Sequence, residues 1–286
     1  MDLETKKCAS IVLYNPDIDR LKENILALNV QVDYIFIFDN NSNNVNQIND
    51  LIKEYEKINF YFSTENKGVA FGHNYNCYLA LNAGFEWILT LDQDSVILPG
   101  LLEKYVNYLN IHEVLERSKI GQLTCYIQDR NEKEINENEL VQKEILWCIT
   151  SGTYVNLHLW NELGKFDELM FIDGVDIDYG ITVKENNYKT IIIPFVGMLH
   201  EVGKINKVIN IFGRKHPIYN HNFIRKYYIA RNSIYIARKH RSVSIIKMFI
   251  KVFNRILFDF VFENDKFTKL KYALRGVRHG FKMEVK

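Results

Sequence analysis

Cysteine is scarce in this chain of 286 residues, which has four, Cys8, Cys77, Cys125 and Cys148, with no Cys-x-x-Cys spacing. This excludes a disulfide framework, gives no sign of a zinc site and favours a reducing cytoplasm as the location. The first ten residues lack the apolar core of a secretory signal peptide. No uninterrupted apolar run is long enough for a transmembrane helix. We therefore expect a cytoplasmic protein without a membrane span.

The net charge of +1 conceals an unequal distribution of charge along the chain. Residues 1–200 hold 16 Lys or Arg against 30 Asp or Glu, whereas residues 201–286 hold 20 against 5. A basic tail on an acidic body suggests contact with something anionic, such as phosphates, lipid headgroups or nucleic acid. Packing of the tail against the acidic body of the same chain explains the charges equally well, so both interpretations stay open.

Apolar runs alternate with segments of helical periodicity through the first third of the chain. The expected order is strand 8–14, helix 18–28, strand 34–38, helix 45–58, strand 59–62, helix 69–83 and strand 87–91. This alternation predicts an α/β domain built on a mostly parallel, doubly wound sheet. With 47% hydrophobic residues, the chain can bury a large core and still carry an appendage.

The middle of the chain continues with a less regular pattern. We expect a helix over 100–117, a strand over 121–127, a charged surface excursion over 128–144, a buried strand over 145–150, a short helix over 156–163, a helix from about 174, and strands over 190–194 and 196–199. The charged excursion has no glycine and is rich in Glu, Asn and Gln, a composition typical of mobile surface segments.

Polar residues follow four of the predicted strands where each one ends: Asn15, Asp39, Asn66 and Asp92. Because the carboxyl ends of parallel strands meet at one edge of a sheet, these loops are expected to converge on one cleft. Asp39 could accept a hydrogen bond from the ring N–H of a nucleotide base, and the loop of Asn66 and Gly68 could let backbone approach a ligand. Each loop alone is explained as well by helix capping, but all four together favour a site.

A buried apolar strand, Trp87 to Leu91, runs directly into Asp92-Gln93-Asp94. Alternation puts the two Asp side chains on the same side of the strand if extended geometry continues through them. Two oxygen donors there suit Mg²⁺, which is usually held by one or two carboxylates together with substrate phosphates. A bare Asp-x-Asp is more often a solvated turn, but the preceding strand and the neighbouring polar loops favour metal binding here.

A second acidic cluster, Asp173, Asp176 and Asp178, lies within the otherwise apolar segment 171–179. If a helix begins in this segment, the acids lie in or near its first turn, where the helix dipole favours them. A carboxylate raised to the mouth of a cleft can also take a proton from an attacking hydroxyl. Helix-start chemistry is the simpler interpretation, and it fits Asp173 best. His200 ends a predicted strand, where a histidine is either structural or a metal ligand.

Taken together, these segments resemble inverting glycosyltransferases of family 2 and, within them, the bacterial rhamnosyltransferases. The matching segments are Ile11-Val12-Leu13-Tyr14-Asn15, Asp39-Asn40-Asn41-Ser42, Asn66-Lys67-Gly68-Val69-Ala70, Gly72-His73-Asn74, Leu91-Asp92-Gln93-Asp94-Ser95, Thr150-Ser151-Gly152, Phe171-Ile172-Asp173, Val175-Asp176, His200 and Tyr227-Tyr228-Ile229-Ala230-Arg231-Asn232. Each is short, but their order and spacing across residues 8 to 240 are specific. Asp-Gln-Asp-Ser is the segment that points to the rhamnosyltransferase branch.

The resemblance implies the GT-A fold, an α/β fold whose mostly parallel sheet is flanked by helices. We expect a catalytic domain over 1–205, with a donor-binding half over about 1–98 and an acceptor-side half over about 99–205. A basic helical extension over 206–286 is expected to follow it.

The resemblance also implies roles for individual residues. Asp176 aligns with the catalytic base, and Asp94, Asp92 and His200 align with ligands of Mg²⁺ or Mn²⁺. The donor-binding residues would be Tyr14, Asn15, Asp39, Asn66, Gly68, Asn74, Asp92, Gln93 and Arg231. The acceptor-side residues would be Ser151, Gly152 and Asp173. The family often has an arginine shortly after the base; Thr182 stands at that position here, and Arg231 is the candidate to replace it.

The implied reaction is transfer of a sugar with inversion to a glycan or lipid-linked acceptor, in bacterial surface polysaccharide synthesis. The expected donor is dTDP-L-rhamnose, with a UDP-hexose as the alternative. A divalent cation would neutralise the departing diphosphate, and a carboxylate would deprotonate the acceptor hydroxyl on the opposite face of the sugar.

Two other classes of function compete with this one. A sugar nucleotidyltransferase would normally have a glycine-rich loop after the first strand, where this chain has Asn15-Pro16-Asp17. A non-enzymatic protein that binds glycans or nucleic acid would use the basic tail. Acids at strand ends would repel phosphate unless a metal intervened, so we expect no nucleic-acid partner.

Residues 243–262 combine apolar residues with a polar stripe, Lys247, Lys251, Arg255 and Asp259, that recurs every four positions. Basic residues continue to position 282. This pattern suits an amphipathic helix lying on an anionic membrane surface, so we expect a peripheral protein at the inner face of the cell membrane. Packing on the catalytic domain or in a homodimer would use the same face, and both stay open.

Overall fold

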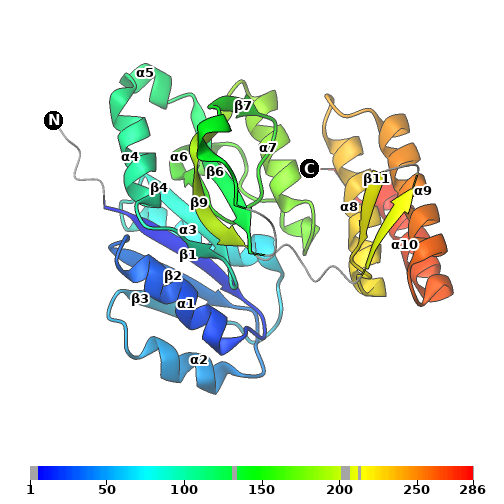
Figure 1. The fold of residues 1–286 in the computed structure, drawn as a ribbon, viewed down its shortest axis with the longest axis horizontal. Helices are drawn as coiled ribbons and strands as arrows, with labels where there is room; N and C mark the ends of the chain where they lie inside the picture. Colours follow the sequence, from blue (N-terminus) through cyan, green and yellow to red (C-terminus); the bar gives the residue numbers. More distant parts are fainter. Residues whose placement is uncertain (1–5, 131–133, 201–206, 212–213, 286) are drawn as a thin grey trace. The chain divides into compact units, whose positions relative to one another are not determined.

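The computed structural model describes residues 6–130, 134–200, 207–211 and 214–285 and is drawn as a ribbon in Figure 1. The chain divides into two units. Unit 1 consists of Met1–Leu169 and Tyr179–Glu201, and unit 2 consists of Met170–Asp178 and Val202–Lys286. The chain therefore contributes to unit 2 twice, first with a short acidic segment and then with its carboxyl-terminal part.

A mixed sheet forms the centre of unit 1. In the part of the chain that the structure describes, its strands are β1 Cys8–Leu13, β2 Tyr34–Asp39, β3 Ile58–Phe62, β4 Trp87–Asp92, β5 Val96–Ile97, β6 Ile120–Asp129, β7 Lys143–Ile145, β8 Thr153–Asn156 and β9 Lys189–His200. They follow the order β3-β2-β1-β4-β8-β6-β9-β5, with β7 paired to β9. β1 runs parallel to both of its neighbours, β2 and β4, and β2 runs parallel to β3.

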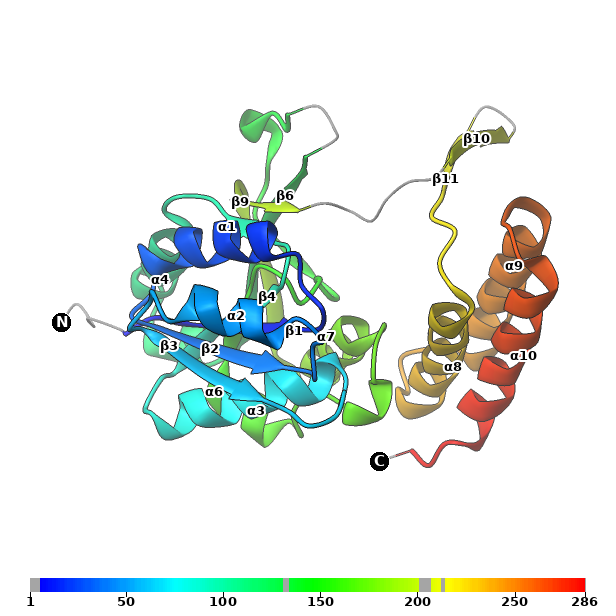
Figure 2. The same cartoon turned by 90° about the horizontal axis from the view of Figure 1, so that it is seen from below.

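Strand alternation sorts the side chains of the sheet onto two faces. Ile11, Leu13 and Ile37 point into the main core, which they share with α1 (Ile18–Asn29), α2 (Val45–Ile52) and α4 (Leu101–Ile111). The opposite face is covered by α3 (Val69–Asn82) and α6 (Leu157–Glu162). Figure 2 shows α1 and α2 on one side of the strands and α3 and α6 on the other. The predicted α/β architecture, mostly parallel around β1, is thus confirmed.

Several predicted bounds differ from the structure. The helix predicted over 45–58 ends at Ile52, where its apolar periodicity gives way to charged residues. The helix predicted over 100–117 is divided into α4 and α5 (Val114–Arg117), because His112 has an extended backbone with ψ 144°. The strands predicted over 190–194 and 196–199 are one continuous strand, β9, whose register with β6 shifts near its middle.

The buried strand predicted over 145–150 is wrong. β7 ends at Ile145, and the next two side chains, Leu146 and Trp147, are 50% and 40% exposed. The chain at Trp147 passes close to Gly180, where an added Cβ would be 2.5 Å from the Trp147 Cβ, so only a residue without a side chain fits at position 180. The predicted excursion contains a 3-10 turn at Glu137–Glu139 as well as β7, and its residues 131–133 lie outside the described part.

Unit 2 contains three long helices, α8 (Phe223–Lys239), α9 (Ile245–Phe262) and α10 (Lys266–Lys282), preceded by a hairpin of β10 (Lys207–Ile211) and β11 (Arg214–Ile218). It also receives the start of α7 (Val175–Glu185), which follows the 3-10 turn Glu168–Met170. Asn222 caps α8 and Ser244 caps α9, each accepting a backbone N–H three residues on. The described helices include none with the length and hydrophobicity needed to cross a bilayer.

A buried ion network joins the three helices of unit 2. Lys226 on α8 donates to Asp259 at 2.6 Å and to Glu263 at 2.8 Å, and Lys269 on α10 donates to Glu263 at 2.9 Å. All four side chains are at most 9% exposed. Charges buried this deeply are tolerated only when they are paired, so the network fixes how the three helices meet.

Helix α10 approaches α8 closely because its inner face is built from small residues. An added Cβ at Gly276 would lie 2.3 Å from the Tyr227 carbonyl oxygen, and one at Gly280 would lie 2.5 Å from the Arg231 carbonyl oxygen. Real Cβ atoms do not come this close to backbone, so larger side chains at either position would force the helices apart.

Replacing Gly276 by Ala is expected to lower the free energy of unfolding by about 1–3 kcal/mol, since overpacking outweighs the helix propensity gained. Urea unfolding followed by circular dichroism measures this. The matched control is Arg275→Ala on the exposed side of the same helix, expected to stay within about 0.5 kcal/mol of the wild type. An unchanged or raised midpoint for Gly276→Ala would contradict the close approach.

Candidate active site

The loops after β1 and β4 are held together by a reciprocal pair of hydrogen bonds. Tyr14 N donates to Oε1 of Gln93 at 2.8 Å, and Nε2 of Gln93 donates to the Tyr14 carbonyl oxygen at 3.4 Å. Gln93 stands between Asp92, which is half-buried, and Asp94, which is exposed. The bonds of Gln93 therefore fix the turn that carries both acids against the neighbouring strand end.

The backbone of Asp92 is anchored from two further directions. Its N–H donates to Oγ of Ser151 at 3.0 Å, and its carbonyl oxygen accepts from Nδ2 of Asn24 at 2.9 Å. Oγ of Ser151 donates in turn to Oγ of Ser95 at 2.7 Å. Because Ser151, Asn24 and Ser95 are fully buried, the loop that follows β4 is held rigidly from below.

The donor set at the end of β4 fits a divalent cation bound together with phosphates. Asp92 and Asp94 supply hard carboxylate oxygens, the ligand type that Mg²⁺ and Mn²⁺ prefer. Within the described residues, no group of three or more His, Cys, Asp or Glu side chains is arranged to hold a metal. A site completed by substrate phosphate oxygens needs no third protein ligand. The side chain of His200, the third expected ligand, lies outside the described residues.

The loop after β2 is ordered around Asp39. Ser42 donates to the Asp39 carboxylate twice, from its N–H at 2.8 Å and from Oγ at 2.6 Å, and Oγ of Ser42 accepts from Asn15 N at 2.7 Å. Burial raises the pKa of the Asp39 carboxyl, and the hydrogen bonds from Ser42 oppose that rise. Asp39 has no exposed surface, so the expected contact with a nucleotide base would require this turn to open.

The loop after β3 is tied to the same edge by Asn40. Oδ1 of Asn40 accepts from Lys67 N at 3.0 Å, and its Nδ2 donates to the Gly68 carbonyl oxygen at 3.3 Å. Asn66 closes the turn by accepting from Gly68 N at 3.0 Å. Gly68 has a φ of 86°, which favours glycine, and it stands directly before α3. The structure thus brings together Tyr14, Asn15, Asp39, Asn66, Gly68, Asp92, Gln93 and Asp94 at one edge of the sheet.

The segment Gly72-His73-Asn74 serves the packing of α3. Gly72 lets the helix approach β1, since an added Cβ would lie 2.8 Å from Val12. His73 is fully buried, with Nδ1 2.9 Å from Oγ of Ser10, and burial lowers its pKa to about 3. The imidazole is therefore neutral at physiological pH and belongs to the core.

Asn74, an expected donor-binding residue, has its amide fully engaged within the protein. Its Nδ2 donates to the Phe166 carbonyl oxygen and to Oε1 of Glu168, while its Oδ1 accepts from Trp160 Nε1 and Phe166 N, at 2.8 to 3.1 Å. These four bonds use both donors and both lone pairs of the amide. Asn74 consequently holds α3, α6 and the 166–168 segment together and offers no hydrogen bond to a donor in this conformation.

Ser151 and Gly152, expected on the acceptor side, lie beneath the β4 loop. Ser151 is fully buried, and Gly152 N donates to the Thr90 carbonyl oxygen at 2.9 Å. The Gly152 carbonyl oxygen accepts from the Tyr105 hydroxyl at 2.6 Å, and its φ of 78° favours glycine. Ser151 therefore supports Asp92 from behind and Gly152 is bonded to Thr90 and Tyr105, so neither offers a free polar group to an acceptor in this conformation.

In unit 2, α8 holds the turn that precedes Asp176. Nδ2 of Asn232 donates to the carbonyl oxygens of Ile172 at 2.9 Å and Asp173 at 2.6 Å. Asp173 has a positive φ of 63°, which is less favourable for Asp than the φ of 88° is for Gly174, so the bonds from Asn232 stabilise this turn. Asn232 is 1% exposed, which makes its two bonds costly to lose.

Two aromatic and ionic contacts extend this support. Nε and Nη2 of Arg225 donate to the Asp173 carboxylate at 3.1 and 3.0 Å, so Asp173, expected on the acceptor side, is bound within the protein. Burial raises the pKa of the Asp173 carboxyl, and Arg225 opposes that rise. Phe171 stacks on Tyr228, and the Arg231 guanidinium lies 4.6 Å from the same ring. Arg231, expected to contact the donor, is engaged with α8 itself.

The first turn of α7 is clamped on its other side by the end of α8. Asp178 is 1% exposed and accepts from Nζ of Lys239 and Nε2 of His240, both at 2.8 Å. Asp176 lies two residues earlier, is half-buried, and accepts from Ile177 N at 2.9 Å. Its backbone is therefore fixed on both sides, by Asn232 before it and by Asp178 after it.

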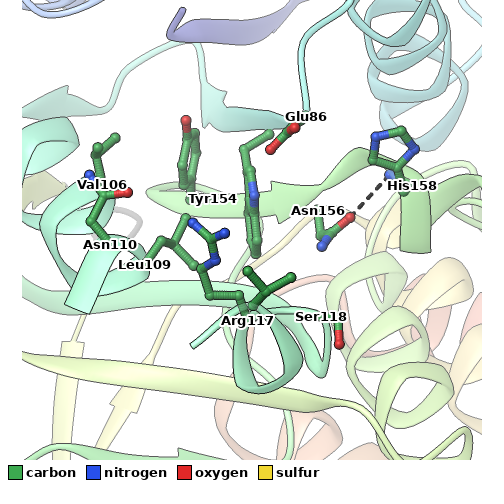
Figure 3. A pocket seen from close by; sticks show the side chains of 11 residues that line it. Glu86, Val106, Leu109, Asn110, Arg117, Ser118, Tyr154, Asn156 and His158 are labelled. Atoms are coloured by element: carbon green, nitrogen blue, oxygen red, sulfur yellow. Dashed lines mark hydrogen bonds between the residues drawn. The ribbon is translucent and has the colours of Figure 1, made fainter. Parts of the chain in front are cut away.

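A pocket of about 330 Å³ lies at the other end of β4 and is shown in Figure 3. Glu86, which precedes the strand, lines it together with Tyr154, Asn156 and His158. The Asn156 side chain accepts from His158 N and caps α6. Six strand residues span about 20 Å, so this pocket is remote from Asp92 and lacks the converging loops of the opposite edge.

Sequence reasoning assigned no supporting role to the residues that hold the site from beneath. Asn24 and Ser95 anchor the β4 loop, while Asn40 and Ser42 organise the loops after β2 and β3. Arg225 and His240 hold the 170–178 segment. Ser95, Asn40, Ser42 and Asn232 stand within the matching segments without such a role, and the only signal at Asn24 is a polar residue on the apolar face of α1.

Comparison with known proteins gives the family of the chain. The family model described as glycosyl transferase family 2 matches residues 8–161, more than half of the chain. The curated protein "dTDP-rhamnosyl transferase RfbF" of Shigella flexneri is 28% identical over 280 residues, which cover 94% of this chain and 92% of that protein.

Solved structures share the fold at low identity. S. aureus TarS 1–349 in complex with UDP-GlcNAc superposes with a TM-score of 0.62 at 12% identity, covering 97% of this chain and 81% of that one. GalNAc-T7 with UDP, GalNAc and Mn²⁺ superposes with a TM-score of 0.61 at 10% identity, and the match covers 84% of this chain and 48% of that one. A longer S. aureus TarS chain gives 0.58 at 11% identity, and this chain spans 44% of its length. The chain therefore has the GT-A fold and belongs to glycosyl transferase family 2.

Proposed function

We propose that this glycosyltransferase moves L-rhamnose from dTDP-L-rhamnose, with inversion, onto a glycan or lipid-linked glycan in bacterial surface polysaccharide synthesis. The observation that carries the proposal is the cross-linked edge of the sheet, where loops after four parallel strands converge on Asp92 and Asp94. The similarity to a dTDP-rhamnosyl transferase over nearly the whole chain supports the choice of sugar.

The donor diphosphate is assigned to the loop after β4. Mg²⁺ or Mn²⁺ would be held by Asp94 and Asp92, with His200 as a further ligand, and would supply charge neutralisation for the departing nucleoside diphosphate. Asp39, Asn15 and Tyr14 are assigned to the nucleotide. The anchoring of the Asp92 backbone by Asn24 and Ser151 keeps the carboxylates oriented without movement during the reaction.

Asp176 is assigned as the base that removes the proton from the acceptor hydroxyl as that oxygen attacks the anomeric carbon. The proton passes to the Asp176 carboxylate, the new glycosidic bond forms and the bond to the nucleoside diphosphate breaks. Asn232 and the Asp178 clamp act as positioning groups, since they hold the backbone on either side of the base. In this proposal the protein acts in the cytoplasm, at the inner face of the membrane.

Replacing Asp94 by Asn is expected to abolish metal-dependent release of nucleoside diphosphate from dTDP-L-rhamnose. Altering a residue that hydrogen-bonds to a metal ligand already lowers metal affinity or activity by ~10–100-fold, so removing a ligand itself should lower activity further. The measurement offers a panel of nucleotide sugars with Mg²⁺ or Mn²⁺ to the wild type, to Asp94→Asn and to the exposed control Glu56→Gln. Turnover of a UDP-hexose alone would reassign the donor, and product formation from a nucleoside triphosphate would indicate a nucleotidyltransferase.

Asp176→Asn is expected to lower kcat by ~10²–10⁴-fold with acceptor present, since the substitution removes a general base. Binding of dTDP-L-rhamnose, measured by calorimetry, is expected to remain, because the donor groups lie elsewhere. Unchanged transfer by this variant would eliminate Asp176 as the base.

Asn232→Asp is expected to lower kcat by up to ~10²-fold, with the KM for the donor unchanged, because a carboxylate would face two carbonyl oxygens and shift the base. Ser233→Ala on the same helix is the control. A rise in donor KM, or an equal loss of kcat in the control, would show that the effect is not one of positioning.

A further inference from the structure

Helix α9 is apolar on two sides, only one of which it buries. Val252, Ile256 and Asp259 face the other helices of unit 2. A second stripe, spaced three or four residues apart, lies outside, and each member is at least 44% exposed: Ile246, Phe249, Ile250, Phe253, Leu257 and Val261. The bundle therefore does not explain why these residues are apolar.

Helix α10 likewise has an inner face that packs on α8 and a separate apolar face that is exposed. Its inner face carries Ala273, Gly276 and Gly280, which pack closely on α8. Phe267, Leu274 and Phe281 recur every seven residues and are 79%, 50% and 44% exposed. Seven residues are about two helical turns, so the three side chains share one outer face.

Ring contacts link the two helices near both ends. The rings of Phe249 and Phe281 lie 6.2 Å apart, and those of the half-buried Phe260 and of Phe267 lie 5.6 Å apart, across the antiparallel pair of helices seen side by side in Figures 1 and 2. We name the surface formed by the two exposed stripes the α9–α10 band. Its nine exposed apolar side chains on two adjacent helices are more than the singly scattered ones normal on a soluble protein.

Basic residues outnumber acids on the exposed surface of the two helices. The exposed basic residues are Lys247, Lys251 and Arg255 on α9, and Lys266, Lys271, Arg275, Arg278 and Lys282 on α10. α10 contains no Asp or Glu, and the one acid of α9, Asp259, is buried and paired with Lys226 and Arg255. The exposed acids nearest to the pair in sequence are Asp265 and Glu284, just beyond the two ends of α10, so the outer surface carries apolar and mainly basic side chains.

We propose that the α9–α10 band docks on a bilayer surface that contains anionic lipids. The phenylalanine and leucine side chains would enter the boundary between headgroups and acyl chains, and the lysines and arginines would meet the lipid phosphates. Each basic residue near such a surface adds to the attraction, which salt weakens. This inference does not depend on which sugar the enzyme transfers.

Charge argues against a second copy of the chain as the occupant. A twofold-symmetric contact through the band would bring the basic residues of one copy against those of the other. Such like-charge contacts are repulsive, whereas an anionic bilayer complements them. The exposed apolar side chains of the band also argue against an acidic protein that would bind through charge alone.

The test is flotation of the full-length protein with vesicles of phosphatidylcholine, with and without 30% phosphatidylglycerol (roughly the anionic content that gives a strong surface potential). The wild type is expected to float with the anionic vesicles and to be released by raised salt. Phe253→Ser combined with Phe281→Ser should reduce binding at least about tenfold, as should Lys271→Gln combined with Arg278→Gln. Because all four residues are exposed, thermal unfolding and donor turnover should not change.

Matched controls make the same kinds of substitution at exposed positions of unit 1. Ile111→Ser combined with Val114→Ser removes apolar side chains that are 78% and 71% exposed, and Lys22→Gln combined with Lys119→Gln removes two exposed charges. Both controls are expected to bind as the wild type does. If they lose binding equally, or if the wild type does not float with anionic vesicles, the proposal is overturned.

A Phe253→Trp variant distinguishes insertion of the α9–α10 band into the bilayer from adsorption on the bilayer surface. Its emission should shift to the blue on addition of anionic vesicles, as the indole leaves water. An unshifted spectrum with bound protein would reject entry of the band into the bilayer. Concentration-dependent dimers in sedimentation velocity, lost in the double phenylalanine variant, would assign the band to a second copy and overturn the proposal.

Discussion

The parallel pairing of β1 with β2 and β4 is the constraint on which the candidate site depends. Its register sets Leu13 beside Asp39 and Val12 beside Asp92, so three strands end at the same level. The loops that follow must then share one edge, and Tyr14 meets Gln93 while Asn15 meets Ser42. A shift of one residue in this register would turn each strand over and bury the acids in the core.

Buried polar side chains turn this proximity into a fixed geometry. Asn24 and Ser151 hold the two backbone groups of Asp92, and Asn40 ties the loop after β3 to the end of β2. A buried polar group that loses its partner costs about 1–3 kcal/mol, so these bonds resist rearrangement. The loop after β4 therefore combines a fixed backbone with an exposed side chain. The residues around Asp94 are anchored by buried hydrogen bonds, while Asp94 itself faces solvent.

The sequence predicted most of the fold because apolar periodicity reports burial directly. It found β1 to β4 and their helices, and through them the converging loops. It failed at Ile145 to Thr150, where the strand ends at Ile145, Leu146 and Trp147 are exposed, and the chain passes close to Gly180, a contact between distant residues that periodicity does not predict.

The same limit applies to the site. Short motifs identified strand-end acids, but they did not separate residues that face a ligand from residues that pack. Asn74 and Ser151 belong to matching segments, yet the structure shows both bonded inside unit 1. Their partners, Trp160 and Ser95 among them, lie 86 and 56 residues away, so only the folded chain reveals them.

Unit 2 combines an acidic segment from the middle of the chain with the carboxyl-terminal helices. The segment Met170–Asp178 groups with these helices. α8 supplies Asn232 to the strained turn before Asp176 and Lys239 to Asp178. The same helix receives the glycine face of α10, which leaves the large apolar side chains of α10 facing outward. α8 thus packs against two partners, since its side chains hold the acidic segment and its backbone lies against the glycines of α10.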